Sequence, residues 1–201
     1  MANKDISQII EDHRLWLSSR RKKGSPANFE SAKLNSIDFS GYDLGEVNFQ
    51  KASLANANFQ ECNLEKAILS QADLTKCNFQ FAVLDKAQIN CAVLKNVDLM
   101  ACDLKGANLD NSDLSDADLY AADLSNSSLK NANLSSARLS GATLTGMVVS
   151  EGTLTSGWNI SAVNCDFIWI ENHKKMRCPS VGNFEPGEFE SRFRNRNNFS
   201  S

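Results

Sequence analysis

Hydrophobic residues recur at every fifth position over most of the chain. The series begins at Phe29 and reaches Leu154 without a polar member. A second series lies two positions before each member and consists mostly of Ala, Cys, Val and Ser, with Tyr42 and Met147 as its large exceptions. A period of five matches neither the turn of a helix, about 3.6 residues, nor the two-residue repeat of a strand. The chain must therefore turn within each unit, and the pattern predicts a solenoid.

A longer period of twenty residues lies within the first. Phe39, Phe59 and Phe79 are twenty residues apart, as are Phe29 and Phe49. Four five-residue units in each coil would place these rings above one another, where they can stack with an offset. The interior is then narrow, which explains the small residues of the second series. These central positions form the expected core, represented by Phe39, Phe59, Phe79, Leu104 and Leu124.

Several units share one motif, in which Ala is followed by Asp or Asn and then by Leu. These units resemble the A-(D/N)-L-x-x signature of the pentapeptide-repeat family, and the resemblance covers residues 27–154. It implies an all-β solenoid, the right-handed quadrilateral β-helix, in which the 26 units would make about 6.5 coils. Residues 13–17 and 182–189 are similar to segments of bacterial, notably cyanobacterial, members. The clearest copies of the motif are Ala72-Asp73-Leu74, Ala107-Asn108-Leu109, Ala117-Asp118-Leu119 and Ala132-Asn133-Leu134.

The residues before the repeats predict a capping helix. A solenoid exposes the apolar interior of its end coils unless another element covers them. We therefore expect residues 1–26 to form an N-terminal capping helix followed by a linker. Amphipathic spacing over residues 5–22 places on one face of this helix Ile6, Ile9, Ile10, His13 and Leu17.

The five-residue register is lost after Leu154. Asn159 and Asn164 stand at places where core residues are expected. Residues 167–170 are apolar and predict a terminal strand, and residues 173–179 predict a basic loop that contains a proline. The repeat domain is therefore expected to end at Leu154.

A C-terminal cap is expected over residues 155–193. Its last part should be a loop and a short helix that fold back on the final coil. The polar residues 194–201 are expected to form a disordered tail. The apolar contacts of the cap should come from Phe184, Phe189 and Phe193.

Composition removes several classes of function. The 201 residues include 22% charged residues and carry a net charge of −3, which excludes an acidic disordered chain and a strongly basic nucleic-acid-binding protein. No apolar run approaches the ~20 residues of a membrane helix, and the first residues lack the apolar stretch of a signal peptide. Six cysteines without such a signal indicate a reducing compartment, so we expect a cytoplasmic protein. Cys91 stands at an outward turn and is the repeat thiol expected to react.

No catalytic or metal-binding pattern is present in the sequence. It lacks a glycine-rich phosphate loop, a G-x-S-x-G motif and a CxxC pair. The two histidines, His13 and His173, belong to opposite caps. We therefore expect no enzyme, no catalytic residues, no metal site and no cofactor.

One candidate site on the outer surface is acidic. The repeat region alone carries a net charge of −7, from 9 basic and 16 acidic residues. The residue before each central Leu or Phe points outward, and like charges stacked at strand spacing repel, so an acidic block should cost some stability. Two interpretations of Asp at this position are open. In the first it only solvates the rod, and in the second it binds a partner or a cation. The acidic block consists of Asp98, Asp103, Asp118 and Asp123.

A second candidate site is the corner between the two sides that carry the acidic block. Apolar residues there stand in turns of adjacent coils and would form a stripe bordered by the four aspartates. Such a rimmed apolar patch favours protein interaction, with an unidentified protein or a second copy of the chain as partner. The alternative is a surface that a cap covers. We name this the aromatic corner, and it consists of Phe81, Val83, Met100 and Tyr120.

Three functions follow from these features. A non-enzymatic scaffold for protein–protein interaction is favoured. Some members of the family imitate duplex DNA and bind type II topoisomerases, but here the modest charge and the lack of projecting loops argue against that role. A cation-binding or enzymatic role of the acidic block is least favoured, because no nucleophile or imidazole stands near it. Direct binding of nucleic acid or of a membrane is not expected.

Overall fold

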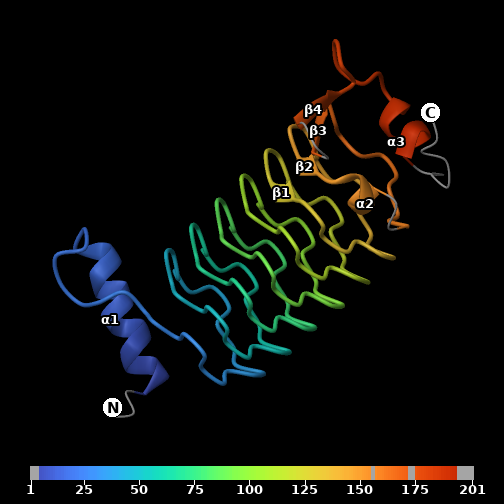
Figure 1. Cartoon of the computed structure of the whole chain (residues 1–201). Coiled ribbons are helices and arrows are strands. Elements are labelled where there is room, and N and C mark those ends of the chain that lie inside the picture. The colour runs from blue at the N-terminus through green and yellow to red at the C-terminus, as the bar shows by residue number, and fades with distance from the viewer. Residues whose placement is uncertain (1–4, 155–156, 172–174, 194–201) are drawn as a thin grey trace.

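The computed structural model describes residues 5–154, 157–171 and 175–193, and the predicted tail 194–201 lies outside them. Figure 1 shows a helix at one end, a stack of coils and a mixed group of elements at the other end. The helices and strands are α1 (Ile6–Ser18), β1 (Ser128–Leu129), β2 (Val148–Val149), α2 (Glu151–Leu154), β3 (Ile168–Glu171), β4 (Lys175–Cys178) and α3 (Glu188–Phe193).

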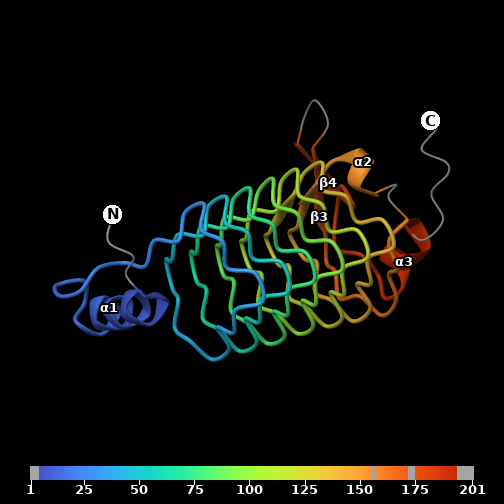
Figure 2. The ribbon, with the colours of Figure 1, turned by 90° about the horizontal axis from the view of Figure 1, so that it is seen from below.

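The coils are held together by parallel bridges between residues twenty positions apart. Four such ladders run along the stack, and they begin at Asn28, Lys33, Asp38 and Asp43. Figure 2 shows the resulting coils lying one above the next. Each five-residue unit turns at a residue with positive φ, for example Ser31 at 57°. The five-residue period therefore produces the predicted β-helix solenoid with four sides to a coil.

Phenylalanine rings stack along the axis of the first coils. The ring centroids of Phe39 and Phe59 are 5.1 Å apart, and those of Phe59 and Phe79 are 4.8 Å apart with planes only 5° from parallel. Phe29 and Phe49 form a second stack at 5.2 Å. Further along the rod, leucines such as Leu104 and Leu124 are completely buried at the corresponding kind of position. The period of twenty therefore describes the packing of the core.

Small polar residues fit into the interior because the backbone accepts their hydrogen bonds. Cys62 lies in the narrow second series, and its Sγ donates to the carbonyl of Phe39 at 2.6 Å. Ser112 and Ser127 stand at equivalent positions and donate to carbonyl groups three residues earlier, at 2.6 and 2.7 Å. Tyr42 is too large for this place, and its side chain is exposed on the first coil. Residues of the second series therefore point into the interior only where the side chain is small or flexible.

The N-terminal end is covered by α1, which is shorter than the predicted 5–22. Ile6, Ile9 and Ile10 pack against the core of the first coil. His13 is completely buried, and its Nδ1 accepts a hydrogen bond from the Ala27 N–H at 3.0 Å. The helix ends at Ser18 because the next residues turn into the left-handed region, with φ of 56° and 64° at Arg20 and Arg21. The predicted amphipathic helix is present, but its basic C-terminal extension is a turn.

The regular coils continue past the point where the sequence suggested an end. One side of the final coil is replaced by α2, so Leu154 lies in a helix instead of a bridge. Thr153 is buried there and donates its hydroxyl to the Leu129 carbonyl at 3.0 Å. This detour adds one residue, and the following bridges join positions twenty-one apart, as in Arg138 with Asn159. The five-residue register is therefore broken by one additional residue, and Asn159 and Asn164 lie outside the core places that a strict count of five would give them.

The one-residue shift brings apolar residues into the core of the final coil. Ile160, Cys165 and Ile170 are buried, whereas Asn159 and Asn164 lie in the outward bridge positions. A shift of one residue turns every side chain to the opposite face of a strand, and this explains why a strict count of five failed here.

The C-terminal end is closed by a hairpin and a helix. β3 pairs in parallel with β2 and antiparallel with β4, so the sheet order is β1-β2-β3-β4. The predicted strand at 167–170 is β3, shifted by one residue, but much of the predicted loop at 173–179 is the strand β4; residues 172–174, with His173, lie outside the described residues. The cap places three phenylalanines in the core, Phe184 from the segment before α3 and Phe189 and Phe193 from α3 itself.

Candidate interaction surface

The outward position before each core residue builds the turns of the rod. Its Asp or Asn side chain accepts a hydrogen bond from the backbone N–H two residues later, which is the geometry of an Asx turn. The preference for Asp or Asn in each unit therefore has a structural cause. These acceptors are Asn28, Asp38, Asp43, Asn48, Asn58, Asn63, Asp73, Asn78, Asp98, Asp103, Asn108, Asp113, Asp118, Asp123 and Asn133.

The acidic block has the geometry that its spacing predicts. Asp98 pairs with Asp118 and Asp103 with Asp123 in the parallel ladders. Lys105 lies between two of these carboxylates, with Nζ at 3.0 Å from both Asp103 Oδ2 and Asp123 Oδ2. The hydrogen bonds to Asp123 and Asp103 raise the pKa of Lys105. The repulsion expected within the block is therefore offset by a shared lysine.

The other half of the acidic block also has partners. Asp98 accepts a hydrogen bond from the side-chain amide of Gln80, and Asp118 Oδ2 lies 2.9 Å from Nη1 of Arg138. Partial burial would raise the pKa of Asp123, but hydrogen bonds from Ser125 and the charge of Lys105 outweigh it, and the pKa is lowered. Because each carboxylate is engaged, the block is a set of turn-forming and paired groups.

The aromatic corner is exposed at the centre of one edge of the rod. The side chain of Phe81 is 52% exposed, that of Val83 is 39% exposed and that of Tyr120 is 42% exposed, whereas Met100 is half-buried. Met100 and Tyr120 occupy the same turn position on adjacent coils. Phe81 stands one position later on the preceding coil, where its backbone N–H donates to the Met100 carbonyl at 3.1 Å. The structure therefore brings the four predicted residues onto neighbouring coils of one corner.

Phe81 also stands at the left-handed turn position that recurs in every unit of the rod. Its φ is 60°, in the left-handed region that favours Gly and Asn, and it is the only aromatic residue with positive φ among the described residues. The equivalent positions on the next two coils are Ala101 and Ala121. A bulky side chain in this region carries a strain on the order of 1 kcal/mol. Phe81 is thus both exposed and strained, and neither burial nor backbone preference accounts for the presence of Phe at this position.

Tyr120 is held in place by its neighbours. The guanidinium carbon of Arg138 lies 4.7 Å from the centroid of the Tyr120 ring, and the same guanidinium binds Asp118. On another side the ring approaches Gly141, where an added Cβ would lie 3.9 Å from Tyr120 Cε2. The ring is therefore a pre-ordered surface, which reduces the entropy that a partner would have to remove on binding.

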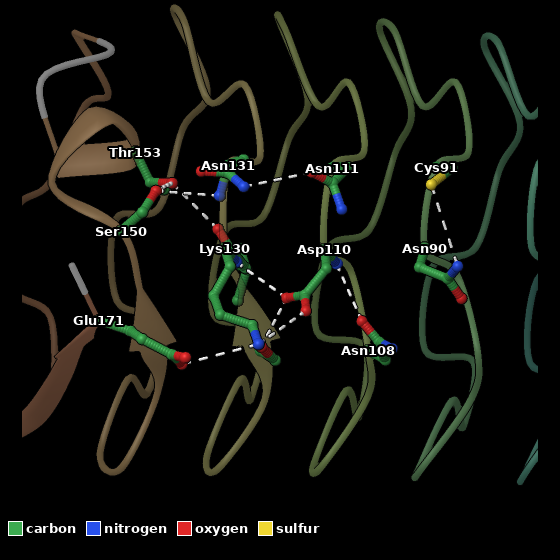
Figure 3. A network of polar contacts seen from close by, with 12 residues as sticks. Asn90, Cys91, Asn108, Asp110, Asn111, Lys130, Asn131, Ser150, Thr153 and Glu171 are labelled. Carbon is green, nitrogen blue, oxygen red and sulfur yellow. Dashed lines mark hydrogen bonds and ion pairs between the residues drawn. The ribbon is translucent and has the colours of Figure 1, made fainter. Parts of the chain in front are cut away.

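A different edge of the rod carries a polar network, which Figure 3 shows from close by. Lys130 Nζ lies 3.3 Å from Asp110 Oδ2 on the preceding coil and 3.6 Å from Glu171 Oε2 on β3, so Lys130 reaches past the β2 coil to the C-terminal strand. The charge of Asp110 raises the pKa of Lys130. Asn131 and Ser150 extend the network along the edge through a backbone N–H to hydroxyl bond of 3.0 Å. These groups satisfy one another, and the network connects the repeats to β3.

Two exposed apolar side chains were not singled out as sites by the sequence patterns. Ile68 and Val93 replace Asp or Asn at the turn-forming position on other sides of the rod, and both are exposed. The interruption of the Asp/Asn series is the signal that could have identified them, as it does for Val83. They lie on separate ladders, each between polar residues, and so they do not form a patch.

The described residues contain no group of three or more His, Cys, Asp or Glu side chains that could hold a metal ion. Within the same residues, no helix combines the length and the apolar character needed to cross a membrane. The six cysteines are all free, and only Cys91 is exposed.

The four ladders and the Asx turns define a β-helix solenoid whose functional groups lie on its outer faces. A sequence model described as pentapeptide repeats matches eight copies, over residues 43–80, 52–88, 77–116 and 112–147. The chain belongs to the pentapeptide-repeat family. No curated protein gives a significant match over its sequence.

The solved structure of one similar protein shows the same fold. The chain is similar to HetL, a pentapeptide repeat protein involved in heterocyst differentiation regulation from the cyanobacterium Nostoc sp. strain PCC 7120, with 22% identity, a TM-score of 0.53 and coverage of 80% of this chain and 70% of HetL. Rfr23 of the cyanobacterium Cyanothece 51142 gives 22% identity, a TM-score of 0.38 and coverage of 78% and 99%. QnrB1, a plasmid-mediated fluoroquinolone resistance protein, has 17% identity and a TM-score of 0.31, with coverage of 69% of this chain and 84% of QnrB1. Cyanobacterial proteins among them agree with the predicted bacterial type.

Proposed function

We propose that this protein is a non-enzymatic scaffold that binds a protein partner through the aromatic corner. One observation carries the proposal: Phe81 places an aromatic ring, 52% exposed, at a left-handed turn position that elsewhere in the rod holds Gly, Ala, Cys or a polar residue. The turn conformation is common to all units of the rod, so the exposed ring is the feature that the repeat does not explain. A protein partner would bury the Phe81 ring and recover the free energy of its hydrophobic surface.

The rod gives this corner its rigidity. Every coil is bonded to the next by parallel bridges, and the rings of Phe59 and Phe79 stack behind the same side. Tyr120 is fixed by Arg138, so that two aromatic rings are offered in a constant relative position. A rigid display of aromatic side chains is the arrangement found at the centres of protein interfaces. The partner is an unidentified protein or a second copy of the chain, in a cytoplasmic setting.

We infer also that the rod is the right-handed quadrilateral form of about 6.5 coils that the family resemblance implies. A role as a DNA mimic that binds a type II topoisomerase receives less support. The carboxylates of Asp103 and Asp123 share Lys105, and Asp118 is paired with Arg138, so much of the charge that would imitate phosphates is neutralised. The same pairing argues against the acidic block as a cation site or a catalytic centre.

The test replaces Phe81 by the residue that this turn prefers. In Phe81→Asn we expect loss of association with the partner, whereas the melting temperature stays the same or rises because Asn adopts positive φ readily. Ile68→Asn is the matched control, because it removes an exposed apolar side chain from another side of the rod. Sedimentation velocity measures self-association, and quantitative pull-down from the host measures association with other proteins. Equal association of the Phe81 variant and the wild-type chain would contradict the proposal.

A further inference from the structure

A cavity of about 390 Å³ lies between the final coil and the C-terminal cap, and residues of α3 contribute to its lining. One wall is the turn from Ala162 to Asp166. The other wall is the segment from Phe184 to Gly187 together with Phe189 and Glu190. Both walls are fixed, since the Phe184 N–H donates to the Asp166 carbonyl at 2.7 Å and the Asp166 N–H donates to Thr145 Oγ1 at 2.9 Å.

Glu190 is the most unusual group in this cavity. The residue is only 8% exposed, and its Oε1 accepts a hydrogen bond from the Val163 N–H at 3.0 Å. Among the described residues, no donor or cation is bonded to its second carboxylate oxygen, and this oxygen is not one of the fully buried side-chain atoms that lack a partner. Glu190 is therefore a largely buried carboxylate whose second oxygen stays accessible and can accept one more donor.

The other charges around Glu190 are negative as well. Asp166 and Glu185 also line the cavity, and none of the described residues that line it is Lys or Arg. Burial raises the pKa of Cys165 to about 12, and the negative charges of Asp166 and Glu190 add to this effect. The cavity therefore has a negative potential that extends to the neighbouring thiol.

The two arginines of the cap that the structure describes have other partners. Arg177 donates to the carbonyls of Pro179 and Gly182, and Arg192 lies 3.7 Å from Glu188. The positive charge that would complement Glu190 therefore does not come from these two arginines.

The apolar part of the cavity indicates which kind of cation would fit beside Glu190. The rings of Phe184 and Phe189 meet edge to face at 5.3 Å and form a hydrocarbon wall next to the carboxylate. A cationic group on an alkyl stem fits such a site, because its head can donate to Glu190 while its stem contacts the rings. The described residues offer no group of ligands suited to a metal ion. We propose that this cavity binds the ammonium or guanidinium group of an organic cation, either a Lys or Arg side chain of a partner or a free alkylamine.

The site lies at the opposite end from α1 and shares no residue with the aromatic corner, so it does not depend on the proposed function. Val163 supplies a direct reporter, because its N–H is bonded to Glu190. The experiment is a titration of the ¹⁵N-labelled full chain, followed by the Val163 amide resonance. The probes are N-acetyl-lysine methylamide, N-acetyl-arginine methylamide and 1,4-diaminobutane. We expect saturable shifts of Val163 and of its neighbours at millimolar probe concentrations.

Two variants test the role of the charge. Glu190→Gln keeps an acceptor for the Val163 N–H and removes the negative charge, and it should weaken binding about tenfold or more. Asp166→Asn leaves the backbone bonds of that residue in place and should weaken binding by a smaller factor. Glu30→Gln, on an exposed turn of the first coil, is the control for net charge and should leave the affinity unchanged.

The probes also distinguish the two sources of the cation. Tighter binding of the capped amino acids than of 1,4-diaminobutane supports a side chain of a partner, and the reverse order supports a free amine. The proposal is overturned if no probe shifts Val163, or if Glu190→Gln, folded by its amide spectrum, binds as well as the wild-type chain. Should Glu190→Gln not fold, unchanged affinity in Asp166→Asn overturns it.

Discussion

The two ends of the rod are closed in different ways. At the C-terminal end the β-ladder itself continues, from β2 through β3 to β4, and three phenylalanines of the cap enter the core. At the N-terminal end, α1 lies on the first coil without joining any ladder. It is held by the contacts of Ile6, Ile9 and Ile10, by the bond from Ala27 to His13, and by an ion pair between Arg21 and Glu46.

This difference shows how stability is distributed among the elements of a solenoid. In a repeat protein each unit is stabilised mainly by its neighbours, so an element that continues the ladder unfolds together with the coils. An element attached by side chains alone can open at a lower free energy than the whole chain. We therefore expect the C-terminal cap to act as part of the rod and α1 to be separable from it.

The largest effect is expected at the C-terminal end. Phe189 is 2% exposed and contacts the rings of Phe184, Phe193 and Trp158. Phe189→Ala should lower the free energy of unfolding by about 3–5 kcal/mol, because the cavity left among rings fixed by the ladder cannot collapse. Chemical denaturation followed by circular dichroism measures it.

The matched control for this substitution is Phe81→Ala. It deletes the same ring from an exposed turn, and its effect should stay within about 1 kcal/mol. If Phe189→Ala cost no more than Phe81→Ala, the C-terminal cap would be separable in the way that we expect of α1, and the contrast between the two ends would be lost.

A smaller effect is expected from acid at the N-terminal end. Burial lowers the pKa of His13 below its ordinary 6.5, although the charges of Asp43 and Glu46 oppose this. The neutral ring is needed because Nδ1 accepts from Ala27, and Nε2 is buried without a hydrogen-bond partner. The unfolded or undocked state binds the proton more readily. The stability of docked α1 is therefore complete above pH 6.5 and is lost as pH falls through the pKa of the folded state.

Hydrogen exchange of the α1 amides and of Ala27, measured between pH 7.5 and 5, checks this prediction. In acid the opening of α1 should become more favourable, so the α1 amides should lose protection against exchange. The amides of the central coils should keep their protection. His13→Gln offers an amide oxygen to the Ala27 N–H and does not titrate, so its α1 protection should not depend on pH in this range. The same pH dependence in His13→Gln would show that His13 is not the group responsible.

The middle of the rod could be predicted from the sequence almost residue by residue. The reason is that each unit meets the same constraints: one large side chain inside, one small side chain beside it, and an Asp or Asn that bonds to its own turn, as Asn108 does. A local rule that repeats is readable from a single sequence. The ends follow no repeat, and there a tertiary feature decides. The hydroxyl of Thr153 and the turn of α2 shift the register by one residue, so that Ile160 takes the core place that a strict count of five would give to Asn159.

The candidate sites were predictable to different degrees for the same reason. The placement of Phe81 and Tyr120 at one corner follows from the period of twenty. The pairing of the acidic block does not follow from this period. It depends on the conformation of the Lys105 side chain, which reaches both Asp103 and Asp123. The cavity at Glu190 was beyond the sequence, because it is formed by segments on either side of the β3–β4 hairpin.

The smallest effect, which changes no stability, concerns the order in which thiols react. Cys91 is exposed and should react with iodoacetamide at once. Three core thiols should react last, at the rate of global unfolding, because they are at most 1% exposed and burial raises their pKa values to about 11 or 12; these are Cys62, Cys77 and Cys102.

Cys165 and Cys178 make this order a test of the C-terminal end. Both are 8% exposed, and they lie on the final coil and on β4. If the cap belongs to the rod, they should be protected almost as well as Cys102, and pulse labelling read by mass spectrometry should show one fast thiol and five slow ones. In Cys91→Ser the fast thiol disappears. Early labelling of Cys165 and Cys178, well before Cys102, would mean that the hairpin opens by itself and that the β-ladder does not bind the cap to the coils.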